Sequence, residues 1–147
     1  MSTPSADFIF TENGHVDVAR LNGLYRLIGW DRRERRTNAE TLEMLRVSSY
    51  YISAQTAQDS LVGFARVCGD PYVVQVLDVI THPEYRRRGI ATRCMVGVLG
   101  HLRQSRYVSV TLTHGGGLGD FYRRFGFRPI GDDTDTRIWQ RDAVQQL

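Results

Sequence analysis

The chain has 147 residues, of which 41% are hydrophobic and 24% are charged, and this balance suits one globular domain over residues 1–147. Its 19 basic residues outnumber its 16 acidic residues by three, an excess too small to predict nucleic-acid binding. No apolar run approaches the roughly 20 residues of a membrane span, and residues 1–7 lack a secretory signal, so we expect a cytoplasmic protein with no membrane partner.

The first half of the chain predicts four strands and two helices. Apolar residues recur at helical spacing over residues 16–28 and again over residues 39–46, where Asn38 is the expected N-cap. The charged segment 31–36 between the two helices is interpreted as a solvated loop. Apolar and β-branched runs bounded by turn residues predict strands at residues 8–10, 50–55, 61–68 and 72–81.

The second half of the chain begins with a long helix and then returns to strands. From near Gly89, six apolar residues follow a 3.6-residue period: Ile90, Cys94, Met95, Val98, Leu99 and Leu102. Further strands are predicted at residues 107–113, 128–130 and 136–141, with a short helix over residues 118–125. This order predicts an α/β (α+β) fold in which about four helices flank a mixed, mostly antiparallel sheet of about seven strands.

The two cysteines are expected to be buried free thiols. Cys68 lies in a predicted strand and Cys94 lies on the apolar stripe of the long helix. Neither has a cysteine or histidine neighbour at metal-ligand spacing, so no metal cofactor is expected.

The segment from residue 76 to residue 92 has the features of a phosphate-binding turn. An apolar strand ends near Thr81 because Pro83 restricts the residue before it, and a helix starts near Gly89. The first turn of that helix presents unpaired N–H groups and the positive end of the helix dipole. Gly89 and Ala91 leave this main chain accessible to a bulky anion. A solvated arginine-rich turn is the alternative, but the flanking strand and helix favour a phosphate site.

The sequence LDVITHPEYRRRGIAT, residues 77–92, resembles motif A of the GNAT superfamily, the acetyl-CoA-dependent N-acetyltransferases, with Ala91 where glycine is commoner. The resemblance implies the GNAT fold, acetyl-CoA as co-substrate, and a binding site between the fourth and fifth strands, which a bulge separates. By the same resemblance, Val79, Ile80 and Thr81 align the pantetheine arm and the thioester. The pyrophosphate is expected at Arg86, Arg87, Arg88, Gly89, Ile90, Ala91 and Thr92.

A second segment, FYRRFGF at residues 121–127, resembles motif B of the same family. The resemblance implies that Tyr122 protonates the departing thiolate of coenzyme A, a task suited to a phenol with an ordinary pKa of ~10. A buried structural tyrosine is the alternative. The phenylalanines of the segment are expected in the core.

The base that removes a proton from the acceptor amine is less clearly marked. The candidates near the expected cleft are Asp78, His114, Glu84 and His82. Asp78 ranks first and His114 second, and a chain of water molecules could replace any of the four. Strand alternation places Asp78 on the same face as Val76 and Ile80, so a carboxylate among apolar neighbours needs an explanation. A buried hydrogen bond explains it as well as catalysis does.

The acceptor pocket is expected beside the first helix. Residues 27–30, Leu-Ile-Gly-Trp, resemble a Val-Gly-Trp element of small GNAT proteins, which implies that Trp30 and Tyr25 wall an apolar slot. Ordinary core packing of Trp30 is the alternative. The glycines at 115–117 could be a lid or a simple connection. The arginine-rich segment 31–36 would disfavour polycationic acceptors if it lined the pocket. Four acidic residues could instead attract an amine, so the charge of the acceptor is not predicted: Asp120, Asp132, Asp133 and Asp135.

Together these features predict a monomeric or homodimeric N-acetyltransferase that acts on a primary amine of a small molecule. The neutral amine would attack acetyl-CoA directly, without an acyl-enzyme and without a metal, and Tyr122 would be the general acid. Two alternatives stay open: a catalytically silent coenzyme A-binding sensor or interaction module, and a protein N-terminal or lysine acetyltransferase.

Overall fold

The computed structural model describes residues 7–132 and 134–141, so the expectations for residues 1–6 and for Asp133 lie outside the described part. The helices are α1 (Val18–Leu27), α2 (Asn38–Val47), α3 (Ile90–Gln104) and α4 (Gly119–Arg123), and a short 3₁₀ turn, η2 (Pro83–Tyr85), precedes α3. The strands are β1 (Phe8–Glu12), β2 (Tyr50–Thr56), β3 (Leu61–Gly69), β4 (Val73–Thr81), β5 (Ser109–Thr113), β6 (Phe127–Pro129) and β7 (Thr136–Trp139).

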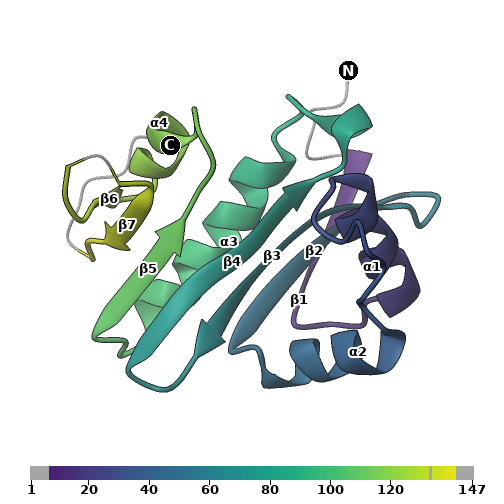
Figure 1. The fold of residues 1–147 in the computed structure, drawn as a ribbon, viewed down its shortest axis with the longest axis horizontal. Coiled ribbons are helices and arrows are strands. Elements are labelled where there is room, and N and C mark those ends of the chain that lie inside the picture. Colours follow the sequence, from purple (N-terminus) through teal and green to yellow (C-terminus); the bar gives the residue numbers. More distant parts are fainter. Residues whose placement is uncertain (1–6, 133, 142–147) are drawn as a thin grey trace.

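These strands form one open sheet in the order β1-β2-β3-β4-β5-β7-β6 (Figure 1). β4 and β5 pair in parallel, and the other neighbouring pairs are antiparallel. The mixed, mostly antiparallel sheet of seven strands with four helices, counted over the described residues, confirms the predicted fold class and element order.

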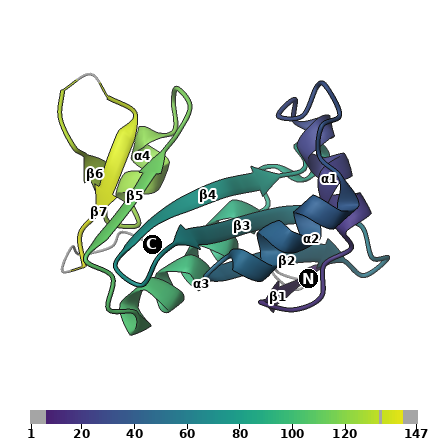
Figure 2. The same cartoon turned by 60° about the horizontal axis from the view of Figure 1, so that its bottom comes forward.

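The sheet is covered on both faces, by α3 on one side and by α1 and α2 on the other (Figures 1 and 2). The larger apolar cluster holds the α3 stripe together with Tyr122 and Phe127. All six residues of the predicted stripe are at most 1% exposed, so the helical period identified this buried face correctly. The smaller cluster joins α1 and α2 to β3 and β4 through Tyr25, Leu45 and Ile80.

The helix ends differ from the predicted ends because of local capping. α1 starts two residues later than expected, because the Asp17 carboxylate caps its first turn. The N-cap of α2 is Thr37, not Asn38: the Thr37 hydroxyl accepts from the Glu40 N–H at 3.2 Å. The Asn38 side chain instead accepts from the Asn22 amide at 3.2 Å, which ties α2 to α1.

The segment 31–36 is more ordered than the expected solvated loop. Asp31 is 7% exposed, and its carboxylate accepts from the N–H groups of Arg35 at 2.9 Å and Arg36 at 3.1 Å. Arg36 is thereby held against α1, with its guanidinium carbon 3.5 Å from the centroid of the Tyr25 ring. Residues 32–35 stay exposed. The expectation was therefore wrong for Asp31 and Arg36, which pack against the domain.

Gly63 allows the first turn of α3 to approach β3 closely. A Cβ at this position would overlap Ile90 Cγ2 and lie 3.2 Å from Ala54 Cβ. We expect Gly63→Ala to lower the free energy of unfolding by about 1–3 kcal/mol through overpacking, measured by urea denaturation. The control is Gly100→Ala on the exposed side of α3, where a Cβ meets no atom within 4 Å and should be neutral or stabilising. Equal destabilisation by both variants would contradict this packing.

Buried tyrosines are expected to make the fold sensitive to alkaline pH. Burial is the largest cause that raises the pKa of three tyrosines: Tyr25, Tyr50 and Tyr122. The Asp78 carboxylate raises the pKa of Tyr25 further, and the Glu12 carboxylate does the same for Tyr50. Unfolding restores the ordinary pKa of ~10, so above that pH the unfolded state loses protons that the folded state keeps. Stability should fall by about 1.4 kcal/mol per pH unit for each such tyrosine. Urea denaturation between about pH 9 and 11 measures this slope, and a flat profile would contradict it.

Candidate functional site

β4 and β5 separate after a short parallel ladder. Their described pairing joins residues 73–75 to residues 109–111, and beyond it the two strands diverge (Figure 1). The expected separation of the fourth and fifth strands is therefore confirmed. The outer edge of β4 after Gln75 has no strand partner among the described residues, so its main-chain polar groups are available to a ligand.

A bulge in β4 lies next to this opening. Between its pairs at Leu77 and Ile80, β4 advances three residues while β3 advances two. Asp78 lies at the extra position, with a left-handed φ of 56°. Val76 packs in the cluster under α3, whereas Ile80 packs in the cluster under α1 and α2. The expectation that Asp78 shares a face with both was therefore wrong, because the bulge reverses the alternation and puts Asp78 on the α1 side.

Two cavities open where the strands separate. The first cavity, of about 540 Å³, is lined by residues 79–81 of β4 and by the turn and first residues of α3. The second cavity, of about 200 Å³, lies between residues 76–79 and residues 112–115. They share a wall of four residues: Trp30, Val79, Leu118 and Tyr122.

The turn before α3 forms an open main-chain cradle in the first cavity. Gly89 has a φ of 80°, and a Cβ added there would meet no atom within 4 Å. The first backbone bond of α3 runs from the Arg93 N–H to the Gly89 carbonyl, so the N–H groups of residues 90–92 precede the intrahelical ladder. Arg86 and Arg87 also line the cavity. Unpaired N–H groups, a helix N-terminus and two guanidinium groups fit a diphosphate.

Arg88 lies elsewhere. Its guanidinium pairs with the Asp7 carboxylate at 3.4 Å and lies over the rings of Phe8 and Tyr85. The preceding residue, Arg87, has a left-handed φ of 64°, which turns the chain between the two arginines. The Arg88 side chain is therefore not among the residues that line the first cavity, so of the three arginines expected at the pyrophosphate only Arg86 and Arg87 line it.

Tyr122 lies at the junction of the two cavities. The residue is 6% exposed, and its ring stacks on His114 with centroids 5.6 Å apart. Within the part of the chain that the structure describes, its hydroxyl has no hydrogen-bond partner, and it is not sealed from solvent. Burial raises the pKa of Tyr122 to about 12. The phenol therefore stays protonated at neutral pH and is available to a ligand as a donor.

His114 lines the second cavity, but both of its ring nitrogens are engaged. Arg137 Nε donates to Nε2 at 2.8 Å, so Nε2 carries no proton, and Nδ1 donates to the Gly115 carbonyl at 2.7 Å. Gly119 makes room for this arrangement, because a Cβ there would lie 2.6 Å from an Arg137 nitrogen. In this geometry His114 supports the Tyr122 ring and has no free lone pair.

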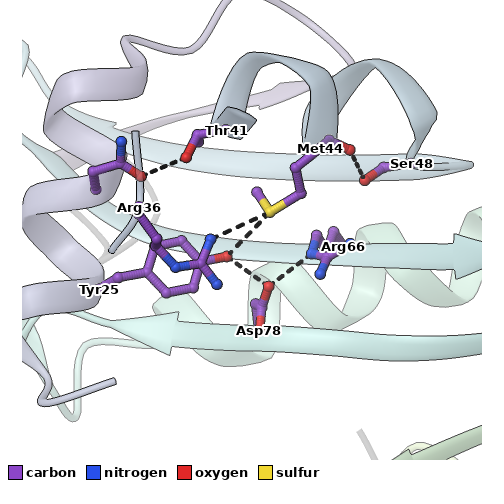
Figure 3. A network of polar contacts seen from close by, with 8 residues as sticks. Tyr25, Arg36, Thr41, Met44, Ser48, Arg66 and Asp78 are labelled. Atoms are coloured by element: carbon purple, nitrogen blue, oxygen red, sulfur yellow. Dashed lines mark hydrogen bonds and ion pairs between the residues drawn. The ribbon is translucent and has the colours of Figure 1, made fainter. Parts of the chain in front are cut away.

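Asp78 lines the second cavity and is held from the α1 side (Figure 3). Its Oδ2 accepts from the Tyr25 hydroxyl at 2.6 Å and from Arg66 Nε at 2.7 Å. Burial alone would lower the pKa of Arg66. The hydrogen bond to Asp78 and the negative charge of Asp78 outweigh this effect, so the pKa of Arg66 is raised. Tyr25 is 0% exposed and lines neither cavity. The expectation that Tyr25 walls the acceptor slot was therefore wrong. Tyr25 does not line the cavity but donates a hydrogen bond to Asp78, which does.

Trp30 has the predicted position on the cavity wall. It is 57% exposed, which excludes ordinary core packing as its role. Gly115 lines the second cavity, and residues 115–117 are exposed. The loop 31–36 lines neither cavity, and the same holds for the described acidic residues: Asp120, Asp132 and Asp135.

Two residues of the site were missed by the sequence reasoning. Arg66 is a charged residue within the apolar strand β3, and this contrast was a usable signal. Arg137 gave no such signal, because its role depends on the approach of β7 to His114.

Neither a metal-binding cluster nor a membrane-spanning helix is found among the described residues. Within residues 7–132 and 134–141, no group of three or more His, Cys, Asp or Glu side chains could hold a metal ion. Among the described helices, none is long and apolar enough to cross a membrane. The expectation of a cytoplasmic protein stays a prediction, as does the oligomeric state.

Comparison with known proteins places this site in a family. The family model described as "Acetyltransferase (GNAT) domain" matches residues 23–137. The uncharacterized N-acetyltransferase ycf52 of Pyropia yezoensis is 25% identical over 90% of this chain and 77% of its own. A solved GNAT-family acetyltransferase of Streptococcus pneumoniae is 28% identical, with a TM-score of 0.67 over 82% of this chain and 87% of that one. YhbS of Escherichia coli, solved with coenzyme A, shares the fold at 16% identity, with a TM-score of 0.69 over 95% of this chain and 87% of that one.

The family match covers the bulged strand, the open turn before α3 and Tyr122, which the structure brings together around the two cavities. The chain therefore belongs to the GNAT superfamily of acetyltransferases.

Proposed function

We propose that the protein transfers the acetyl group of acetyl-CoA to a primary amine of a small molecule. The observation that carries this proposal is Tyr122, a buried tyrosine at the junction of two cavities whose hydroxyl has no protein partner among the described residues. A donor in this position suits a reaction in which one cavity holds the leaving group and the other holds the acceptor.

The first cavity fits the donor substrate. Its open main-chain turn at Gly89 and the guanidinium groups of Arg86 and Arg87 would hold the diphosphate. Residues 79–81 provide an unpaired strand edge between this turn and Tyr122, along which an extended arm would lie. The Arg88 side chain is left out of this set because it pairs with Asp7.

Acetyl-CoA would supply an acetyl group already activated as a thioester. The amine must lose a proton before it can attack, since an ammonium group has no lone pair. Tyr122 would donate its proton to the departing sulfur and regain one from the acetylated nitrogen. Of the two predicted bases, Asp78 has an oxygen free to accept a proton, whereas Arg137 engages the Nε2 lone pair of His114. We therefore place Asp78 before His114.

The second cavity supports a small acceptor. Its volume of about 200 Å³ and its shared wall with Trp30 suit a compact amine with an apolar body. A peptide amine presents the same reactive group, so a protein acetyltransferase is the second candidate. A silent coenzyme A-binding module is disfavoured by the unbonded Tyr122 hydroxyl, which such a module does not need.

The test is thiol release from acetyl-CoA against a panel of arylalkylamines, amino acids, polyamines and peptide N-termini. We expect the fastest release with the arylalkylamines. Faster release with peptides would favour the second candidate, and no release with any amine would overturn the proposed activity.

A further inference from the structure

Asp78 has a backbone conformation that non-glycine residues seldom adopt. Its φ of 56° lies in the left-handed region, where asparagine and aspartate are the most tolerated side chains after glycine. Rare conformations of this kind cluster at functional sites. Here the residue occupies the β4 bulge at the wall of the second cavity, and its side chain is 16% exposed.

One oxygen of the Asp78 carboxylate is held and the other is free. Oδ2 receives two hydrogen bonds, from the Tyr25 hydroxyl at 2.6 Å and from Arg66 Nε at 2.7 Å (Figure 3). Across the described ranges, Oδ1 has no hydrogen-bond partner, and it is not sealed from solvent. Two donors on one oxygen fix the orientation of the carboxylate and leave Oδ1 for a ligand.

The two donors are themselves fixed. Tyr25 is fully buried, and the guanidinium of Arg36 lies over its ring at 3.5 Å. Arg36 is in turn held by the buried carboxylate of Asp31, which accepts from its N–H. The loop that carries Trp30 and the carboxylate that lines the cavity are therefore joined in one network.

Among the described residues, the remaining wall of the second cavity holds no second carboxylate that could bind a cation. Trp30, Leu77 and Leu112 are apolar, and Asp78 is the one carboxylate that lines the cavity among the residues that the structure describes. His114 has its Nε2 lone pair engaged by Arg137. A charged amine in such an apolar space needs a carboxylate at hydrogen-bond distance.

We propose that Asp78 Oδ1 binds the ammonium group of the acceptor, and that Tyr25 and Arg66 are positioning residues that hold this oxygen toward the second cavity. The inference rests on the proposed function and names its acceptor class: compact cationic primary amines whose apolar body lies against Trp30. An α-amino acid would place its own carboxylate beside Asp78 and bind weakly through like-charge repulsion.

The test is binding calorimetry in the presence of saturating coenzyme A, with benzylamine and benzyl alcohol as probes. They have similar size and differ in charge. We expect the wild-type protein to bind benzylamine at least about tenfold more tightly than benzyl alcohol. Asp78→Asn should abolish this preference and leave the affinity for benzyl alcohol unchanged, because asparagine tolerates the same backbone conformation.

The positioning role is tested by Tyr25→Phe, which removes one hydroxyl and keeps the ring. It should reduce the preference for benzylamine by about three- to tenfold. The matched control is Tyr51→Phe, which removes the hydrogen bond from that tyrosine to the Gly14 carbonyl and should leave the preference intact. Equal effects of the two variants would overturn the positioning role.

A preference for benzylamine that survives Asp78→Asn, or its absence from the wild-type protein, would overturn the assignment of Asp78. Thiol release from acetyl-CoA with benzylamine is measured separately. If this reaction is silent while the charge preference depends on Asp78, the proposed function fails and the ammonium site stands.

Discussion

Tyr122→Phe is expected to lower kcat by about 100-fold, or about 2.7 kcal/mol of transition-state stabilisation, while the KM for acetyl-CoA changes less than about threefold. The physical reason is that the variant loses the proton donor to the departing sulfur. The hydroxyl has no hydrogen-bond partner among the described residues, so its loss breaks no hydrogen bond there. The ring packing against His114 and Phe121 is kept, so the fold should be preserved. Steady-state kinetics with thermal unfolding as a check measures both quantities.

The control for this variant is Tyr107→Phe. The Tyr107 hydroxyl contacts His101 Nε2 at 2.8 Å and lines neither cavity. The Tyr107→Phe substitution should leave kcat within about twofold of the wild-type value. A Tyr122→Phe enzyme as active as the wild type would remove Tyr122 from the chemistry, and a parallel rise in KM would indicate a binding role instead.

Gly89→Glu is expected to weaken coenzyme A binding by at least about 100-fold. The new side chain would project into the open space of the first cavity and bring a carboxylate to the site expected for the diphosphate. The left-handed φ of 80° also costs about 1–2 kcal/mol for a side chain other than glycine. Calorimetry measures the affinity, and urea denaturation measures the cost to the fold.

Two controls separate charge from strain in that experiment. Gly89→Ala carries the backbone strain without the charge and should keep most of the affinity, because its methyl group meets no atom within 4 Å. Gly100→Glu carries the charge on the exposed side of the same helix and should bind normally. Unchanged affinity of Gly89→Glu would refute the placement of the diphosphate.

The parts of the structure that follow local rules were predictable from the sequence. The α3 stripe is set by the helical period, and the start of α3 after Gly89 follows from glycine and the strand before it. Tyr122 and Trp30 were identified by resemblance to family motifs, and the structure puts both on the shared cavity wall.

The parts that depend on register and on distant contacts were not predictable. The face of Asp78 was misassigned because a one-residue bulge reverses strand alternation, and the bulge is defined by pairing with β3 rather than by local residues. The direction of the Arg88 side chain, toward Asp7, follows a left-handed φ at Arg87 that its residue type does not favour. Tyr25 and Asp78 meet across 53 positions of sequence, so their hydrogen bond was visible only in the fold.

The decisive measurement is a crystal structure of the protein with coenzyme A. We expect the diphosphate on the N–H groups of residues 90–92 and the sulfur within about 3.5 Å of the Tyr122 hydroxyl, facing the second cavity. A diphosphate bound away from this turn, or a sulfur out of reach of Tyr122, would refute both placements.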